Sequence, residues 1–375
     1  MNKILFVANI HKHFSAFHIP YINWLKSQGF EVHVAANDGS TRINEADKQF
    51  DISINRNPFS IGNLIALKDL KNILKKENYC LVHCHTAMGS VIARLAAKKF
   101  RINNNLKVIY TVHGFHFYKD SPRIYWELYY KMEKYLSRFT DAIITINEED
   151  YQIVKSNQFK NQYSFKTSGV GINTNKFNGL DFSDLASVRL RNKYSDEVFL
   201  IIYIAEFIPR KNHRFIIESI PILKENLENF KFIFAGRGVL KNEIKNLAME
   251  NGVTSYIDFL GFRKDIGELI WMSNIGVSVS NQEGLPMNVA EEMYASKPVI
   301  ATQIRGHVDL IDHGKDGFLF RKHDKKSFVA HIKYLYENPD KRLQIGEEAK
   351  IKSKKFELEN CLSEMQSIYK QFLDV

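Results

Sequence analysis

Short apolar runs alternate with longer amphipathic stretches along almost the whole chain, and this alternation limits the possible folds more than any other feature. The runs at 3–10, 31–36 and 81–85 are rich in aliphatic residues, and stretches with helical spacing, such as 64–76, separate them. Strands that alternate with helices are joined by crossover connections, which place the strands side by side in a parallel sheet. The sequence therefore predicts an α/β fold with doubly wound sheets.

The alternation stops once and then begins again. Two glycines interrupt it in the segment S-G-V-G-I-N at 168–173, and a second series of strands and helices begins at Val198. The length of 375 residues also exceeds what one hydrophobic core usually supports. We expect a Rossmann-like domain over 1–167, a second over 168–352 and a helical tail over 353–375. Ligands bind at the carboxyl ends of such strands, so a site is expected in a cleft where the two sheets face each other.

Charge and composition narrow the range of partners. The chain carries 52 Lys and Arg against 42 Asp and Glu, a formal charge of +10, which favours an anionic partner such as nucleotide phosphate or acidic lipid. The lysines are dispersed, so we expect no nucleic-acid binding. No apolar run approaches the about 18 residues of a membrane span, and the N-terminus resembles a first strand more than a signal peptide. The cysteines Cys80, Cys84 and Cys361 have no paired spacing, which predicts no disulfide and a cytoplasmic location.

Two glutamates eight positions apart, Glu283 and Glu291, form the most informative segment. Pro286 suits the first turn of a helix, which places Glu283 in the preceding loop and Glu291 about one and a half turns into the helix. Amides at a helix start can hold an anion, and a carboxylate beside them can accept hydrogen bonds from sugar hydroxyls. The alternative is structural, with Glu283 capping the helix and Glu291 on its solvated face.

Six further segments occur in an order that resembles the family 4 glycosyltransferases, whose E-x₇-E signature the two glutamates match. They are H-C-H-T at 83–86, V-H-G at 112–114, S-G-V-G-I-N at 168–173, A-E-F-I-P-R-K-N at 205–212, A-G-R-G at 235–238 and L-G-F at 260–262. The resemblance covers essentially the entire chain. It implies a retaining enzyme with the GT-B fold, in which two Rossmann-like domains face each other across a cleft and the C-terminal helix packs back towards the N-terminal domain.

The same resemblance assigns roles to the matching residues. It implies that Lys211 neutralises the leaving diphosphate, that Glu283 contacts the donor sugar and that His113 lies near the transferred sugar. The remaining donor-binding residues that it implies are Arg210, Gly236, Gly238, Phe262, Gly284, Leu285, Pro286 and Glu291. The family usually has an arginine where this chain has Glu206. Arg210 could supply the missing charge from a neighbouring position, and the alternative is that Arg210 is simply solvated.

The acceptor side of the site is predicted less sharply. His85 and Thr86 stand at the end of a strand, where they can touch a ligand, and His11, Lys12 and Ser15 follow the first strand. That loop lacks both the adjacent glycines common in the family and the G-x-G-x-x-G of a dehydrogenase.

No metal cofactor is expected. The consecutive residues His83, Cys84 and His85 cannot surround one zinc ion. No D-x-D motif is present, so the diphosphate is expected to be neutralised by Lys211, Arg210 and the amides at the helix start.

The helical segment at 123–135 mixes aromatic and basic residues. This combination suits a membrane interface, and the alternative is an aromatic core stripe with solvated lysines. The segment itself favours neither alternative. The charge of +10 on the whole protein favours peripheral association with an anionic membrane, on its cytoplasmic face.

The sequence, with this resemblance, predicts transfer of a hexosyl or N-acetylhexosaminyl group from a UDP-sugar to a lipid-linked saccharide in bacterial surface polysaccharide synthesis. The UDP and the lipid acceptor are implied by similarity to capsule and exopolysaccharide members of the family. One alternative is a UDP-sugar 2-epimerase of the same fold, which would need further carboxylates around the sugar. Another is a non-catalytic partner subunit, which would be expected to lack Glu283 or Lys211.

Overall fold

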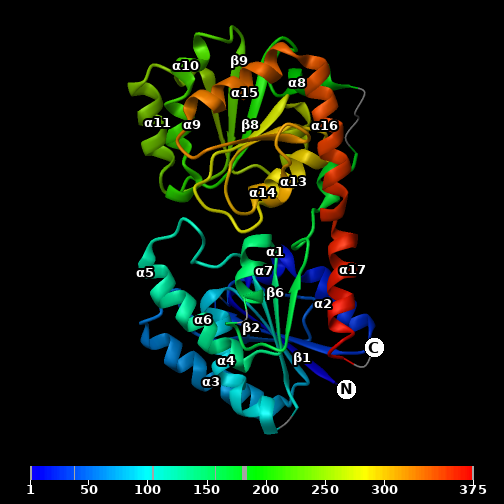
Figure 1. Ribbon diagram of the computed structural model, residues 1–375. Helices are drawn as coiled ribbons and strands as arrows, with labels where there is room; N and C mark the ends of the chain where they lie inside the picture. The colour runs from blue at the N-terminus through cyan, green and yellow to red at the C-terminus, as the bar shows by residue number, and fades with distance from the viewer. Residues whose placement is uncertain (1, 38, 104, 157, 180–183, 374–375) are drawn as a thin grey trace. The chain divides into compact units, whose positions relative to one another are not determined.

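The chain divides into two compact units in the computed structural model (Figure 1), which describes residues 2–373 except 38, 104, 157 and 180–183. Unit 1 comprises Met1–Val170 and Glu359–Val375, and unit 2 comprises Gly171–Leu358. The limits predicted from the sequence lie close to these, after residues 167 and 352. Each unit is built around its own parallel sheet, so the expected pair of Rossmann-like domains is confirmed.

The sheet of unit 1 has seven strands in the order β3-β2-β1-β4-β5-β6-β7, and every neighbouring pair is parallel. The strands are β1 (Lys3–Ile10), β2 (Glu31–Asn37), β3 (Lys48–Asp51), β4 (Leu81–His85), β5 (Lys107–Val112), β6 (Ala142–Thr145) and β7 (Tyr163–Lys166). The chain adds strands on one side of β1 and then, from β4 onwards, on the other side. In sheets of this kind ligands bind outside the carboxyl ends of the strands where the order reverses, which here are β1 and β4.

Helices cover both faces of this sheet. They are α1 (Lys12–Phe17), α2 (Ile19–Ser27), α3 (Ile61–Glu77), α4 (Ala87–Asn103), α5 (Arg123–Tyr125), α6 (Lys131–Leu136), α7 (Glu148–Lys155) and α17 (Leu358–Tyr369). A π-helical turn, Trp126–Tyr130, joins α5 to α6, so the helix predicted at 123–135 is present with a local change of winding. Among the described residues, no helix is long and apolar enough to span a membrane.

The two faces of the sheet bury different side chains, because successive residues of a strand point in opposite directions. In β1, Leu5 packs in the apolar cluster on one face, and Ile4 and Phe6 pack in the cluster on the other. Met365 and Tyr369 of α17 belong to that second cluster. The C-terminal helix therefore returns to the N-terminal unit, as the resemblance implies.

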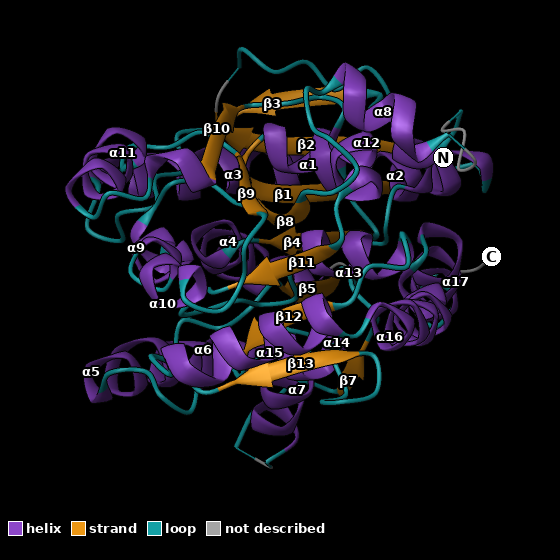
Figure 2. Cartoon of the chain, turned by 90° about the horizontal axis from the view of Figure 1, so that it is seen from above, coloured by secondary structure: helices purple, strands orange, loops and turns teal. Residues whose placement is uncertain are grey.

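The sheet of unit 2 has six parallel strands in the order β10-β9-β8-β11-β12-β13, which Figure 2 shows in sequence from top to bottom. The strands are β8 (Phe199–Ile204), β9 (Phe230–Ala235), β10 (Ile257–Gly261), β11 (Ile275–Ser278), β12 (Val299–Thr302) and β13 (Gly317–Phe320). Here the order reverses between β8 and β11, so the carboxyl ends of these two strands mark the expected ligand site.

Helices also flank the sheet of unit 2. They are α8 (Leu185–Arg191), α9 (His213–Ile217), α10 (Ile220–Lys224), α11 (Lys241–Glu250), α12 (Ile266–Met272), α13 (Met287–Tyr294), α14 (His307–Leu310), α15 (Lys325–Glu337) and α16 (Pro339–Ser353). In β8, Ile201 and Tyr203 pack on one side of the sheet, and Leu200 and Ile202 pack on the other. A strand buried on both faces explains the continuous apolar run that the sequence shows from Val198.

Candidate active site

Three charged side chains meet beyond the carboxyl ends of β8 and β11 in unit 2. Lys211 ends a short 3₁₀ turn that follows β8, and Glu283 lies in the loop between β11 and α13. The Lys211 Nζ donates a hydrogen bond to Glu283 Oε1 at 2.5 Å, and Arg210 Nη1 donates to Glu283 Oε2 at 3.0 Å. The structure thus brings together Lys211, Glu283 and Arg210, which the sequence places in two segments more than 70 residues apart.

The charge balance of this cluster suits an anionic ligand. Burial raises the pKa of Glu283, but the charges of Lys211 and Arg210 outweigh burial and bring that pKa below its ordinary value. The carboxylate is therefore ionised at neutral pH and accepts from both cations. Two positive groups against one negative group leave a net positive site, and the side chain of Arg210 is 45% exposed and can reach a phosphate.

Both structural alternatives for the two glutamates are wrong. Pro286 is the N-cap of α13, one residue before the predicted helix start, and no side chain caps the helix. Glu291 is buried and not on a solvated face, and its Oε1 accepts a hydrogen bond from Lys176 Nζ at 2.5 Å. Burial raises the pKa of Glu291, and Lys176 opposes that shift. A buried carboxylate held by one lysine is a group that a ligand hydroxyl can approach.

The glycines of the A-G-R-G turn are required by close packing. A Cβ at Gly236 would lie 1.9 Å from the carbonyl oxygen of Ala205. Gly238 has a φ of +155°, and its Cβ would lie 2.5 Å from the carbonyl oxygen of Phe207. Side chains at these positions would therefore displace the loop that leads from β8 to Lys211. This packing role exists beside the predicted approach of a phosphate.

The other predicted donor residues surround the same loop ends. Phe262 is 63% exposed, with the Arg237 guanidinium 5.1 Å from the centre of its ring, and an exposed ring can stack on a planar base. Leu285 is buried next to the Pro286 cap. A Cβ at Gly306 would lie only 2.6 Å from the carbonyl oxygen of Gly284. The absence of a side chain at Gly306 therefore allows the loop before α13 to pack closely against the loop after β12.

In unit 1, the predicted residues gather at the carboxyl ends of β4 and β5. His113 follows β5, and its Nε2 lies 3.4 Å from Nδ1 of His85 at the end of β4. Thr86 has a φ of +61°, a conformation that non-glycine residues rarely adopt. Its Oγ1 accepts a hydrogen bond from the backbone N–H of Asn9 and donates one to the Asn9 side chain at 2.7 Å. Such strain at a strand end is common at ligand sites.

A pocket of about 360 Å³ opens beside these residues. Its lining includes the polar side chains of Thr86 and His113 and the apolar or aromatic side chains of Phe59, Leu128 and Tyr129. The pocket therefore offers polar groups that a sugar could contact together with exposed apolar side chains, Phe59 and Leu128.

The prediction for the loop after β1 needs a correction. His11 is 0% exposed, and its Nε2 lies 2.8 Å from Asp51 Oδ1. Because its ring is fully buried and its Nε2 is held by Asp51, His11 supports the loop and is withdrawn from the acceptor residues. Lys12 and Ser15 are exposed on α1 and stay predicted contacts.

Sequence reasoning missed several side chains of these sites. Arg305 Nε donates to the carbonyl oxygen of Glu283 at 3.1 Å, Lys176 holds Glu291, and Asn9 holds the turn at Thr86. Arg305 lies three residues after the end of the strand β12, and Asn9 lies at the carboxyl end of β1. Polar residues at strand ends were the available signal, because ligands bind at that edge of a parallel sheet. No comparable signal marks Lys176.

Comparison with known proteins decides the family. The family model "Glycosyl transferases group 1" matches residues 189–352, and "Glycosyl transferase 4-like" matches residues 3–147. The putative glycosyltransferase EpsD of Bacillus subtilis is 40% identical over 373 residues, covering all of this chain and 97% of that protein. The chain belongs to the group 1, family 4-like glycosyltransferases. The sequence-based assignment is confirmed.

Two further relatives and two solved structures agree with this assignment. The glycosyltransferase is 28% identical, over 72% of each chain, to an Escherichia coli UDP-Gal:alpha-D-GlcNAc-diphosphoundecaprenol alpha-1,3-galactosyltransferase. It is 26% identical to the Staphylococcus aureus capsular polysaccharide biosynthesis glycosyltransferase CapM, over 94% of this chain and 93% of that one. Anabaena HepE with UDP and glucose matches with a TM-score of 0.80 at 18% identity, over 99% and 100% of the chains. WaaG, a glycosyltransferase involved in lipopolysaccharide biosynthesis, matches with a TM-score of 0.74 at 14% sequence identity, over 98% of this chain and 99% of that chain. These two likenesses confirm the GT-B fold.

Proposed function

We propose that this glycosyltransferase moves a hexosyl or N-acetylhexosaminyl group from a UDP-sugar to a lipid-linked saccharide during synthesis of a surface polysaccharide. The E. coli relative is named for a UDP-Gal donor and a diphosphoundecaprenol-linked acceptor. A Campylobacter jejuni relative, 24% identical over 77% of each chain, is also named for a diphospho-undecaprenol-linked acceptor. CapM is named for capsular polysaccharide synthesis, and HepE was solved with UDP.

The observation that carries the proposal is the cluster of Lys211, Arg210 and Glu283 at the switch point of unit 2. We assign the donor diphosphate to the two cations and the donor sugar to Glu283. Glu291 then accepts from the ribose and Phe262 faces the base. In this arrangement the ammonium group of Lys211 stabilises the negative charge that develops on the departing UDP.

The proposed reaction is a front-side displacement that needs no divalent metal. The bond between the anomeric carbon and the diphosphate oxygen breaks, and a bond to the acceptor oxygen forms on the same face. The acceptor hydroxyl gives its proton to the departing diphosphate oxygen, so the anomeric configuration is retained. His113 steadies the sugar and does not attack it. Lys211, Arg210 and the amides at the start of α13 balance the charge of the diphosphate.

The proposal is tested by thermal shift against nucleoside diphosphates and UDP-sugars, because a ligand that binds the native state raises its melting temperature. UDP and one UDP-sugar are expected to give the largest shifts. That UDP-sugar is then incubated with and without a lipid-linked saccharide. Transfer that requires the acceptor supports the proposal, and an epimer formed without acceptor would instead establish the 2-epimerase.

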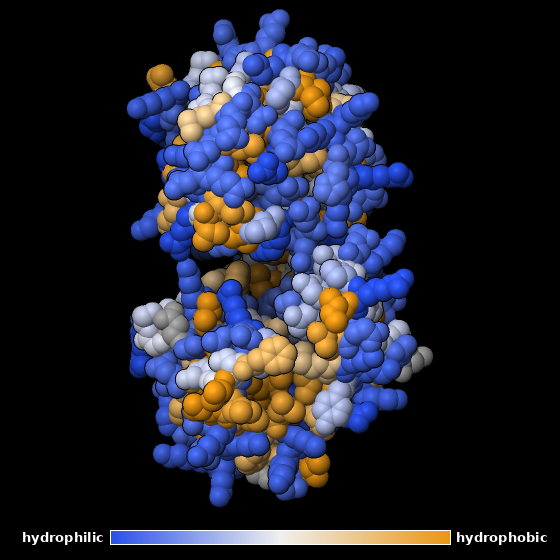
Figure 3. Space-filling view, turned by 90° about the vertical axis from the view of Figure 1, so that its left-hand side faces the viewer, coloured by the Kyte–Doolittle hydropathy of each residue, from blue (hydrophilic) through white to orange (hydrophobic). Residues whose placement is uncertain are grey.

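An exposed apolar surface on unit 1 supports association with a membrane. Its side chains are each more than half exposed: Phe59, Ile61, Leu64, Ile65, Ile124 and Leu128. Figure 3 shows apolar side chains gathered on the face of unit 1 that carries α3 and α5. Trp126 and Tyr130, from the same segment, pack instead against the core. The segment at 123–135 therefore has one side that packs in the core and another side that is exposed and available to a membrane.

We propose that this apolar surface rests on the cytoplasmic face of an anionic membrane, where the lipid of the acceptor enters the pocket near Phe59 and Leu128. Apolar side chains enter the headgroup boundary, and neighbouring lysines attract anionic lipid. Lys68 on α3 and Lys131 on α6 are exposed and could contact anionic headgroups. Lys131 also pairs with Glu127, so its contribution is partly balanced.

Replacing Phe59, Ile61 and Leu128 together with serine is expected to weaken binding to phosphatidylglycerol vesicles about tenfold or more, because three side chains lose their burial in lipid. Cosedimentation measures the change. Leu190→Ser with Val239→Ser, two exposed apolar residues of unit 2, is the matched control and is expected to change nothing.

Binding to vesicles is also expected to rise with anionic lipid and fall with salt. Lys131→Glu with Lys134→Glu is expected to weaken binding to anionic vesicles. Binding that depends on neither lipid charge nor ionic strength would refute the membrane proposal. Unchanged binding of the triple serine variant would refute it as well.

A further inference from the structure

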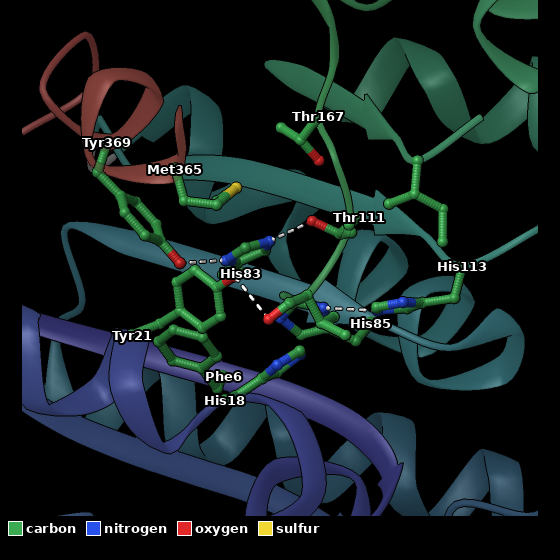
Figure 4. A pocket seen from close by; sticks show the side chains of 13 residues that line it. Phe6, His18, Tyr21, His83, His85, Thr111, His113, Thr167, Met365 and Tyr369 are labelled. Carbon is green, nitrogen blue, oxygen red and sulfur yellow. Dashed lines mark hydrogen bonds between the residues drawn. The ribbon is translucent and has the colours of Figure 1, made fainter. Parts of the chain in front are cut away.

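Four histidines from separate parts of unit 1 converge next to the predicted acceptor site. His13 lies in α1, His18 lies between α1 and α2, His85 ends β4 and His113 follows β5. One ligand atom from each lies within 4.8 Å of the others. Figure 4 shows the rings of His18, His85 and His113 close together in the pocket, with His113 pointing at His85.

The spacing fits a bound metal ion. His85 Nδ1 and His113 Nε2 are 3.4 Å apart. Nitrogen ligands of a tetrahedral zinc ion, each about 2.0–2.1 Å from the metal, lie about 3.4 Å from one another. Two of the four nitrogens thus already have the separation of neighbouring ligands, and small rotations of the other rings would complete the set.

The hydrogen bonding of these histidines is incomplete in a way that points to a ligand. Among the residues that the structure describes, Nε2 of His13 is buried without a hydrogen-bond partner. Neither ring nitrogen of His18 forms a hydrogen bond of good geometry, although the backbone of Phe17 is close. Buried polar atoms are nearly always hydrogen-bonded, because an unpaired one loses its hydrogen bonds to water and gains none within the protein. His83 in the same pocket is different, since its ring nitrogens contact the hydroxyl groups of Tyr369 at 2.6 Å and Thr111 at 2.8 Å.

The surroundings favour a small ion over a sugar or phosphate. The cavity beside His18, His85 and His113 has a volume of about 20 Å³, which holds about one water-sized particle. Burial lowers the pKa of His18 to about 4 and that of His113 to about 3. Neutral imidazole is the form that binds metals, and zinc, copper and nickel ions prefer it.

We propose that His13, His18, His85 and His113 bind one divalent transition-metal ion, and the chemistry of four imidazole ligands favours Zn²⁺ as the physiological occupant. The sequence pointed to no metal because the consecutive residues 83–85 cannot enclose an ion, whereas the fold adds ligands from α1 and β5. The ion would bind to His113, the residue that the proposed function places next to the transferred sugar. Zinc therefore competes with sugar and inhibits transfer, and it takes no part in neutralising the diphosphate. The binding claim itself is independent of the proposed function.

Titration of untagged, chelator-treated full-length protein with ZnCl₂ against a chromophoric chelator tests the site. One Zn²⁺ per chain is expected to bind, and metal at about 100 times Kd is expected to raise the melting temperature by about 5 °C or more. Co²⁺ is expected to give the strong visible absorption of a tetrahedral complex. Less than one ion per chain, or no change in either signal, would overturn the proposal.

Variants separate this site from general binding of metal to surface histidines. His13→Gln and His18→Gln are each expected to weaken Zn²⁺ binding at least about tenfold, because losing a ligand costs no less than losing an outer-shell partner. His13 is half-buried, so its variant is expected to fold even if that of His18 does not. His331→Gln is the control, since His331 lies in unit 2, where its ring packs against His313 and Phe318 and is not part of the four-histidine cluster. Unchanged affinity in His13→Gln, or equal loss in His331→Gln, would contradict the assignment.

Discussion

Replacing Lys211 with alanine is expected to lower kcat by about 10²–10³-fold, the effect of removing one group that stabilises developing negative charge in a buried site. Lys211 is the buried cation of the donor cluster, and its Nζ contacts Glu283 Oε1. UDP affinity is expected to fall as well, and calorimetry with UDP measures that loss separately from turnover. Arg210→Ala, at the exposed cation beside it, is expected to have a smaller effect.

Lys211→Ala also removes a partner of a buried carboxylate, so a loss of stability has to be distinguished from a loss of catalysis. Glu283 keeps Arg210 in this variant, and the fold is expected to survive with a lower melting temperature. The double variant Lys211→Ala with Glu283→Gln provides the comparison. If the double variant turns over as fast as Glu283→Gln alone, Lys211 serves only to hold Glu283, whereas a further loss of turnover assigns Lys211 a role of its own. Near-native turnover in Lys211→Ala alone would also dismiss the diphosphate role.

Glu283→Gln is expected to lower kcat by about 10²-fold with the fold retained. The carboxylate accepts hydrogen bonds from Lys211 and Arg210, and an amide accepts less strongly and turns its N–H groups towards those cations. The sugar hydroxyls therefore lose a charged acceptor. Steady-state kinetics with the donor identified by thermal shift measures the change.

Glu291→Gln is the matched control for Glu283→Gln, eight residues along in the same loop and helix. Glu291 is paired with Lys176, away from the cations beside Glu283. Because its proposed contact is the ribose, its loss is expected to raise the KM for the donor more than it lowers kcat. If both glutamine variants change only the melting temperature, neither glutamate takes part in transfer.

The sequence predicted the two sheets because their central strands are long apolar runs. It did not predict β3 and β7, the outer strands of unit 1, because each has only four residues and lacks a continuous apolar run. Edge strands are partly exposed, so their composition resembles that of loops. The start of α13 was misplaced by one residue because Pro286 suits both an N-cap and a first helical turn.

The donor cluster was predicted residue by residue through the resemblance, and the structure adds how the side chains meet. The pairing of Lys211 with Glu283 depends on β8 and β11 being neighbours, which no local pattern reveals. The four histidines illustrate the same limit more strongly. His13, His18, His85 and His113 come from three regions of the sequence, and only the parallel order of β1, β4 and β5 brings them together.

Retaining transfer from a UDP-sugar without a divalent metal is the central claim, and NMR of the product tests it most directly. The product is made from the UDP-sugar that stabilises the protein most, with a lipid-linked saccharide acceptor and excess chelator. The account predicts that product forms and that its new linkage keeps the anomeric configuration of the donor. An inverted anomeric centre, or no product until magnesium or manganese is restored, would contradict it.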